Sequence, residues 1–103
     1  MKIYTIETIP GAEYEALGLV KGNVVRAKHI GRDLMAGLKN IAGGEINSYT
    51  DMLAESREIA TDRMIGEAER LGADAVIGVR FQASSVMEGT SEIIAYGTAV
   101  KIK

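Results

Sequence analysis

Two charged residues of the longest predicted helix lie where an apolar surface is expected. Arg57 and Glu67 fall close to the centre of the apolar stripe to which Leu53, Ala60 and Met64 belong. Burying such charges is costly unless they are paired or hydrogen-bonded. The sequence therefore predicts one of three arrangements: an ion pair within or between subunits, a long side chain that extends its charge outward into solvent, or a polar pocket at a subunit boundary that binds a carboxylate or a phosphate.

The predicted pocket draws on the helix and on the strand that follows it. Glu45, Arg63 and Arg80 are the candidate partners of the two charges, and Arg57 or Arg80 would hold the anion. The residues assigned to the pocket are Glu45, Tyr49, Arg57, Glu67 and Arg80.

An enzyme is the alternative interpretation of the same residues. Glu45, Tyr49 and Arg57 could act as acid, base and anion clamp in a site shared between subunits. The sequence contains no recognisable nucleophile–base pair, and this favours a binding module over an enzyme.

Metal ligands are scarce in this sequence. It has no cysteine and a single histidine, His29, which removes cysteine-based zinc or iron–sulfur sites and any multi-histidine site within one chain. A ring of subunits could still place one His29 per chain around its axis and so bind a divalent metal ion. The alternative is that His29 is a polar residue at the end of a strand.

The stretch GGEINSYTD, Gly43 to Asp51, precedes or begins the long helix. Free N–H groups at a helix start attract anions, and glycines let a ligand approach the backbone. However, Asn47 or Ser48 can cap the helix, and Ser48-x-x-Asp51 resembles a capping box. The spacing matches no nucleotide-binding motif, so capping is the favoured interpretation.

Acidic residues recur on the opposite side of the same helix. A solvated outer face is the simplest explanation, while a Ca²⁺ or Mg²⁺ site or a docking surface for a basic partner are the alternatives. A docking role would suit a purely structural or adaptor protein. The residues are Asp51, Glu55, Glu58, Asp62 and Glu69.

Length and composition bound the remaining possibilities. The 103 residues fit one domain, 1–103, and 47% hydrophobic with 25% charged residues is ordinary for a folded protein. The net charge of −2, with lysine and arginine scattered, disfavours nucleic-acid binding. No apolar run approaches the ~20 residues of a membrane span, and MKIYTIETIPG does not resemble a signal peptide. We expect a cytoplasmic protein.

The sequence predicts an α+β fold with one dominant helix on an antiparallel sheet. Alternation and turn residues indicate strands, and the helical period indicates helices. The predicted elements are a short strand in KIYTIE, a bent strand or hairpin over 14–27, a short helix over 33–41, a long helix over 48–71 ended by Gly72, and a hairpin made by ADAVIGVRFQASSVM and SEIIAYGTAVKIK.

Both faces of the predicted C-terminal hairpin are apolar or small. In its last strand Ile94, Tyr96 and Val100 share one face, and Ile93 and Ala95 share the other. The strand before it is expected to alternate in the same way, with one face formed by Ala75, Ile77, Val79 and Phe81. A sheet covered on one side normally presents a polar second face to water. Exposed apolar surface of this extent indicates self-association, unless the N-terminal segments wrap over the second face of a monomer.

The runs VKGNVVRA, IGRDLMAGLKNIAGGEINSYTDML, SREIATDRMIGEAERLGADAVIGVRF and EIIAYGTAV resemble the YbjQ-like family over nearly the whole chain. The resemblance implies a dodecin-like β-α-β-β core assembled as a homopentameric ring, and a heavy-metal-binding label without an established activity. Heavy metals favour thiolate and imidazole ligands, which this chain almost lacks. The family's characteristic positions correspond to Gly43, Gly44, Glu45, Tyr49, Arg57, Arg63, Gly72, Ala73 and Arg80.

Overall fold

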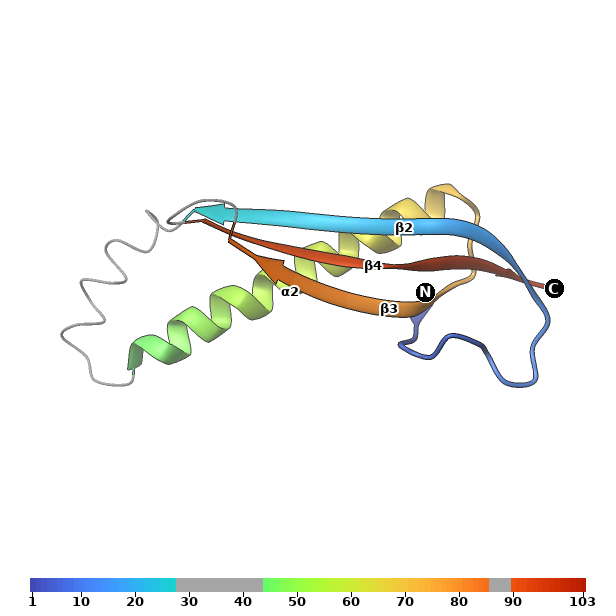
Figure 1. Cartoon of the computed structure of the whole chain (residues 1–103), viewed down its shortest axis with the longest axis horizontal. Coiled ribbons are helices and arrows are strands. Elements are labelled where there is room, and N and C mark those ends of the chain that lie inside the picture. Colours follow the sequence, from blue (N-terminus) through green and yellow to red (C-terminus); the bar gives the residue numbers. More distant parts are fainter. Residues whose placement is uncertain (28–43, 86–89) are drawn as a thin grey trace.

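The computed structural model describes residues 1–27, 44–85 and 90–103, apart from the side chains of 27 and 44–49. One long helix lies behind a four-stranded sheet (Figure 1). The elements are β1 (Lys2–Ile3), β2 (Tyr14–Ala27), α2 (Gly44–Arg70), β3 (Ala75–Ser84) and β4 (Thr90–Ile102). The α+β fold with one long helix packed on a sheet is confirmed.

The sheet is mixed rather than wholly antiparallel. Its strand order is β1-β3-β4-β2, with β4 antiparallel to both β2 and β3, and β1 parallel to β3. The predicted strand in KIYTIE is shorter than expected, although the N–H of Tyr4 still donates to the carbonyl oxygen of Val76 at 2.8 Å. The prediction of an antiparallel sheet is therefore wrong for β1, which runs parallel to β3. The predicted helix over 33–41 lies outside the described residues.

The helix α2 begins one turn earlier than the sequence predicts. It starts at Gly44, so Asn47 and Ser48 lie inside the helix and the predicted capping box at Ser48 is wrong. The carboxyl-terminal end agrees with the prediction. There the N–H groups of Gly72 and Ala73 donate to the carbonyl oxygens of Glu69 and Ala68 at 3.0 and 3.1 Å, which is the hydrogen-bond pattern of a Schellman helix end.

A glycine in β2 allows the helix to approach the sheet closely. A Cβ atom at Gly22 would collide with the carbonyl oxygen of Ala60 and the backbone nitrogen of Met64, and would lie 2.7 Å from the Cβ of Arg63. The segment 14–27, predicted as a bent strand or a hairpin, is one strand. Its pairing with β4 is irregular between Ala16 and Gly18.

The buried stripe of α2 packs mainly on β2. Ala60, Met64 and Ala68 are fully buried, as expected, and pack with Val20 and Val24 of β2. Ser56 is also buried, and its hydroxyl donates to the carbonyl oxygen of Met52 at 2.9 Å. Arg57 is exposed, as expected if its long side chain extends its charge from the apolar stripe into solvent.

A bulge divides β3 into two unlike halves. The register between β3 and β4 shifts between Ile77 and Arg80, and Gly78 has a φ of 62°, a conformation that favours glycine. Ile77 packs on the sheet face opposite α2, whereas Val79 packs in the core beneath α2. The predicted alternation that placed Ala75, Ile77, Val79 and Phe81 on one face is therefore wrong, because it did not include the extra residue.

We call Ala75–Val79, with the residues of β1 and β4 that face it, the proximal half of the sheet. The distal half is Arg80–Ser84 with the facing part of β4. The face opposite α2 is the outer face. In the proximal half the N-terminal segment covers the outer face, where Tyr4, Ile9 and Tyr14 pack on a small cluster of Ala75, Ile77 and Val100. The predicted wrapping by N-terminal segments is thus realised, but only over this half.

The distal half lacks such a cover among the described residues. All five residues of Arg80–Ser84 are exposed. Val25 of β2, which pairs with Glu92 on the other side of β4, is exposed too. The chain extends 56 × 23 × 17 Å, and a single helix cannot cover both faces of so long a sheet. In the described part of the chain, no helix has the length and apolar character needed to span a membrane.

Candidate functional site

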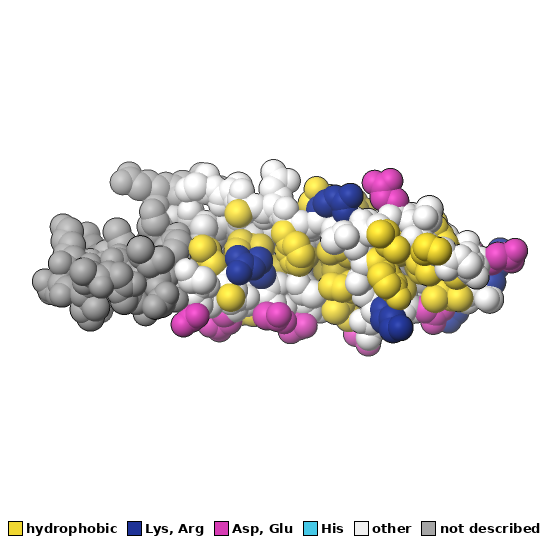
Figure 2. Space-filling view, turned by 90° about the horizontal axis from the view of Figure 1, so that it is seen from below, with side chains coloured by type: hydrophobic (Ala, Val, Ile, Leu, Met, Phe, Trp, Pro, Cys, Tyr) yellow, Lys and Arg dark blue, Asp and Glu magenta, His cyan; other side chains and the backbone are white. Residues whose placement is uncertain are grey.

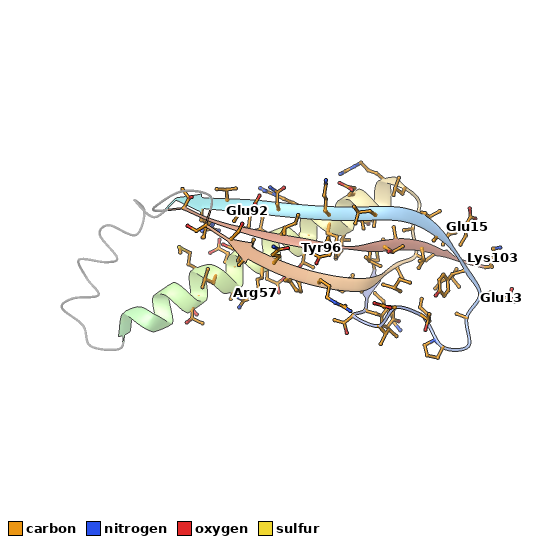
Figure 3. The ribbon with its side chains drawn as sticks, viewed as in Figure 1. Glu13, Glu15, Arg57, Glu92, Tyr96 and Lys103 are labelled. Atoms are coloured by element: carbon orange, nitrogen blue, oxygen red, sulfur yellow. The ribbon has the colours of Figure 1, made fainter. Side chains whose placement is uncertain are left out.

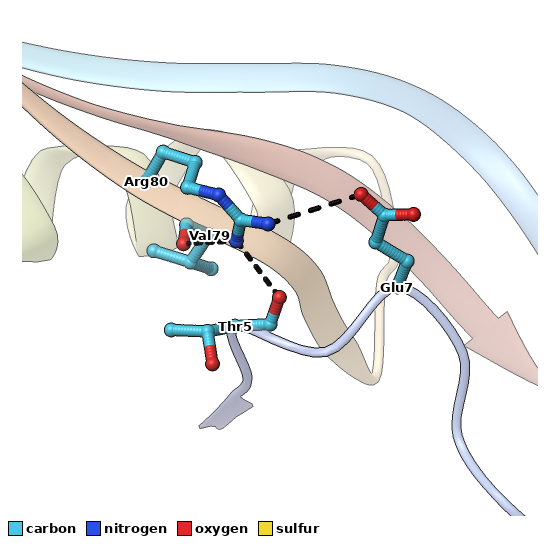
Figure 4. Close-up of polar contacts among 4 residues, drawn as sticks. All are labelled: Thr5, Glu7, Val79 and Arg80. Atoms are coloured by element: carbon cyan, nitrogen blue, oxygen red, sulfur yellow. Dashed lines mark hydrogen bonds and ion pairs between the residues drawn. The ribbon is translucent and has the colours of Figure 1, made fainter.

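Arg80 fastens the N-terminal segment to β3. Its guanidinium donates to the carbonyl oxygens of Thr5 at 2.8 Å and of Val79 at 3.0 Å, and lies 3.8 Å from the carboxylate of Glu7 (Figure 4). The Arg80 side chain is about half exposed, so the Glu7 ion pair contributes little by itself. These contacts satisfy Arg80 within one chain at the boundary between the two halves.

Arg63 and Glu67 hydrogen-bond to the free edge of β2. The Arg63 guanidinium donates to the carbonyl oxygen of Asn23 at 2.6 Å, and the N–H of Lys21 donates to the Glu67 carboxylate at 3.4 Å. An edge strand leaves every second residue's backbone groups unpaired. The partners of Glu67 and Arg63 are therefore backbone groups of this edge, whereas the sequence suggested a side-chain ion pair.

Arg57 has no such partner. It lies on α2 near the end of β3 (Figure 3), and its guanidinium makes no ion pair or hydrogen bond with a described residue. A guanidinium presents several donors in a plane, which suits recognition of a carboxylate or phosphate. Among the described side chains of the predicted pocket, Arg57 is the one without a partner in the described residues.

The predicted pocket does not form within one chain among the described side chains. Arg80 binds the N-terminal segment, Glu67 lies at the β2 edge and Arg57 projects from another flank of α2. The side chains of Glu45 and Tyr49, and the whole of His29, lie outside the described residues. A pocket built from these residues at a subunit boundary stays a prediction.

The structure shows a shallow hollow that the sequence analysis missed. It has a volume of about 410 Å³ and is lined by Ile59, Asp62, Arg63, Gly66 and Arg70 on the flank of α2. Gly66 leaves the hollow open because it has no side chain. The sequence signal that could have revealed this hollow is the spacing of Arg63, Gly66 and Arg70, which places a glycine between two arginines on one side of the helix. The three charged side chains are exposed to solvent, so the hollow is not a built ligand site.

The uncovered apolar surface is the most distinctive feature of the described chain. Leu19, Val25 and Phe81 are 65%, 55% and 47% exposed. Figure 2 shows hydrophobic side chains as a broken band along one side of the molecule, with acidic side chains along a margin. The outer face is more mixed than predicted, because Lys21 and Asn23 alternate with the two apolar residues of β2.

The acidic residues of α2 form the solvated face that the sequence predicted. Asp51, Glu55, Glu58, Asp62 and Glu69 are all exposed. Glu55 pairs with Arg26 at 3.2 Å. The other four make no ion pair among the described residues, so this face is available to a partner.

Asp74 fixes the proximal end of the sheet. Its carboxylate accepts a hydrogen bond from the N–H of Ile102 at 2.8 Å and lies 3.4 Å from the ammonium of Lys101. The Ile102 hydrogen bond is the main reason that the Asp74 pKa falls below its usual 3.8, with Lys101 adding to the effect and desolvation opposing it.

The described residues do not provide a metal site. They contain no cluster of three or more histidine, cysteine, aspartate or glutamate side chains, and the whole sequence lacks cysteine. Soft heavy metals bind thiolates and imidazoles in preference to isolated carboxylates. The described part of a single chain therefore does not fit a heavy-metal ion.

A long helix on a four-stranded mixed sheet defines a small α+β module, and the described residues leave one face of the distal half of its sheet without a cover. The chain belongs to the YbjQ family, whose model carries the description "putative heavy-metal-binding" and matches residues 1–103.

The family includes many bacterial relatives of similar length. The chain is 61% identical over 100 residues to a UPF0145 protein of Psychromonas ingrahamii, covering 96% of this chain and 95% of that protein. It is 61% identical over 102 residues to a UPF0145 protein of Helicobacter hepaticus, covering 99% and 98% of the two chains.

A solved structure shares the fold. A protein of unknown function from Pediococcus pentosaceus, assigned to the DUF74 family, superposes with a TM-score of 0.71 and 20% sequence identity, covering 100% of this chain and 98% of that one. At this identity the similarity shows the fold alone.

Proposed function

We propose that this chain is a subunit of a homo-oligomeric, non-enzymatic module that binds a metal ion or a small ligand at its subunit boundaries. The observation that carries the proposal is exposed apolar side chains on both faces of the sheet. Leu19 and Val25 are 65% and 55% exposed on the outer face of β2, and Phe81 is 47% exposed on the opposite face of β3. Large apolar side chains exposed in this way are typical of interfaces. Identical copies are the simplest partners, and a closed ring, as in the five-membered assembly implied by the resemblance, leaves no copy unpaired.

The guanidinium of Arg57, which has no partner among the described residues, supports a ligand at such a boundary. An approaching subunit would enclose Arg57 together with part of the apolar surface, and a buried guanidinium requires an anionic partner. That partner would be a carboxylate or phosphate of a ligand, or a carboxylate of the neighbouring chain. A metal ion would need ligands from several subunits, with His29 the candidate.

Native mass spectrometry of the purified protein tests this function. We expect a multiple of the 11.0 kDa chain mass, with an additional mass from a bound ligand. The Arg57→Ala variant should keep the oligomer and lose an anionic ligand, while Arg70→Ala, in the shallow hollow, should keep both. A wild-type protein that is monomeric at every concentration would refute the proposal, and an oligomer without additional mass would refute its ligand-binding part.

The metal part of the proposal needs its own measurement. After dialysis against a divalent metal ion, the bound metal per subunit is determined by elemental analysis for wild type and His29→Ala. Loss of metal in the variant supports a site at the ring axis. Equal metal content in both proteins would remove His29 as a ligand.

A structural adaptor is the second candidate. It is favoured by the exposed carboxylates of α2, four of which lack an ion-pair partner among the described residues. A basic protein partner would then bind this face. Replacing Asp51, Glu58 and Asp62 by their amides should weaken that partner's binding without changing the subunit count.

A further inference from the structure

The outer edge of β3 is free in the distal half of the sheet. Arg80, Gln82 and Ser84 pair with Tyr96, Ile94 and Glu92 of β4. The N–H of Val79 donates to the carbonyl oxygen of Tyr4, on the side of β3 away from β4. Because backbone groups alternate in direction along a strand, the N–H and C=O groups of Phe81 and Ala83 also point away from β4. No described residue forms a hydrogen bond with these groups.

The same edge is occupied in the proximal half. There the carbonyl oxygen of Val76 accepts from the N–H of Tyr4, and the N–H groups of Gly78 and Val79 donate to the carbonyl oxygens of Ile6 and Tyr4, at 2.7 to 2.9 Å. The N-terminal segment therefore acts as a strand partner up to the bulge and not beyond it. The distal edge continues a ladder that is already formed.

The distal edge also lacks the features that usually prevent strand pairing. Natural edge strands are protected by charged residues, prolines or covering side chains. Phe81–Ser84 contains no charge and no proline. By contrast, Arg63 and Glu67 hydrogen-bond to the edge of β2 at Asn23 and Lys21, so the chain protects part of one edge and leaves the other open.

The side chains beside this edge are partly apolar and accessible. Phe81 is 47% exposed and pairs with Ala95, on the face that α2 covers elsewhere, whereas Gln82 pairs with Ile94 on the outer face. An added strand would cover both sides of β3 at once. It would gain backbone hydrogen bonds and buried apolar area together.

We propose that a second copy of this chain adds a β-strand to the free edge of β3 at Phe81–Ser84. The deduction rests on the proposed homo-oligomer and names the surface through which it assembles. The described residues at this edge supply no charge for selecting a foreign peptide beyond Arg80, which is engaged with Thr5 and Glu7. A second copy also brings its own exposed apolar side chains, among them Leu19 and Val25 on the outer face of β2.

The Ala83→Pro variant tests this surface. Proline removes the outward N–H of Ala83, which has no partner in the described chain, and edge strands tolerate proline at such positions. Light scattering coupled to size exclusion should give an oligomer mass, a multiple of the chain mass, for wild type. The matched control Ala83→Ser, which keeps the N–H, should give the same oligomer mass. Ala83→Pro should give the 11.0 kDa monomer with an unchanged far-ultraviolet circular dichroism spectrum.

The outcomes separate this inference from the proposed function. A folded Ala83→Pro protein with the wild-type mass would overturn strand addition while leaving the oligomer intact. A monomeric wild type would overturn both. Should Ala83→Pro fail to fold, Ala83→Lys keeps the N–H and places a charge on the edge. The Ala83→Lys variant should self-associate at least about tenfold more weakly than wild type. If this variant associates as strongly as wild type, the inference is refuted.

Discussion

The two halves of the sheet use similar residues in different surroundings. In the proximal half, Ala75, Val76 and Ile77 are buried, with α2 on one face and the N-terminal segment on the other. In the distal half, Phe81 and Ala83 are exposed in the same strand. The difference lies in what covers β3, because the apolar side chains continue past the bulge while the cover stops.

This comparison shows why local pattern alone gives an incomplete account of the molecule. Apolar alternation identifies a strand that is to be buried, but it does not say by which element. The proximal half is buried by its own chain. In the distal half, apolar side chains and backbone hydrogen-bonding groups have no partner among the described residues, and an interface requires such groups.

The largest expected difference is between the losses of unfolding free energy caused by two substitutions in β3. Ile77→Ala removes a side chain that is 5% exposed and should lower the free energy of unfolding by about 3 kcal/mol. Phe81→Ala, four residues along, should cost less than about 1 kcal/mol in the monomer. Both are measured by urea denaturation in the Ala83→Pro background, which removes the contribution of assembly. Equal losses at the two positions would mean that the distal half is covered within one chain.

A second test concerns the contact of α2 with the sheet. Gly22→Val places a side chain against the backbone of Ala60 and Met64 and should cost about 2 to 3 kcal/mol of unfolding free energy. Gly66→Ala on α2 has no close neighbour other than Arg70 at 3.7 Å and should stabilise the helix by up to about 1 kcal/mol. If Gly22→Val were neutral, the close approach of helix and sheet at this point would be disproved.

The boundary between the halves depends on Arg80. Arg80→Ala removes hydrogen bonds to Thr5 and Val79 and should cost about 1 kcal/mol of unfolding free energy, since the side chain is half exposed. Amide exchange of Gly78 and Val79, which bond to the N-terminal segment, should become faster. Arg70→Ala serves as a control, and unchanged exchange in Arg80→Ala would argue against its role in fastening this segment.

The smallest effect is a pH dependence of the proximal half. The Asp74 pKa in the folded protein lies below 3.8, so the unfolded chain takes up this proton first as the pH falls. The contribution to stability is therefore complete above about pH 4 and is lost as the pH falls through the folded-state pKa. The urea midpoint of Asp74→Asn should decrease less between pH 5 and pH 3 than that of wild type, with Glu58→Gln as the control. An identical decrease in Asp74→Asn and wild type would contradict this assignment.

Much of the fold could be predicted from the sequence because its signals are local. The apolar period of α2, the turn signal at Gly72 and the alternation of β4 depend on residues near one another in the chain. The bulge at Gly78 could not be placed, since an extra residue changes the face of every later side chain. The start of α2 was misplaced because Asn47 and Ser48 resemble a cap even inside a helix.

The candidate site was less predictable for a physical reason. A helical wheel gives the angle of a side chain around its own axis but not the rotation of that helix on the sheet. In the structure Ser56 is buried and Arg57, the next residue, is exposed. The partners of Arg80 and Glu67 come from segments distant in sequence, at Thr5 and Lys21, and no periodicity could indicate them.

Hydrogen exchange of two backbone amides tests the central claim most directly. The N–H groups of Phe81 and Ala83 should exchange as fast as unstructured amides in the dilute monomer, and become as protected as that of Gln82 when the protein concentration is raised. Rapid exchange of both amides at concentrations where light scattering finds only the oligomer would contradict the account, because the free edge of β3 would then take no part in the assembly.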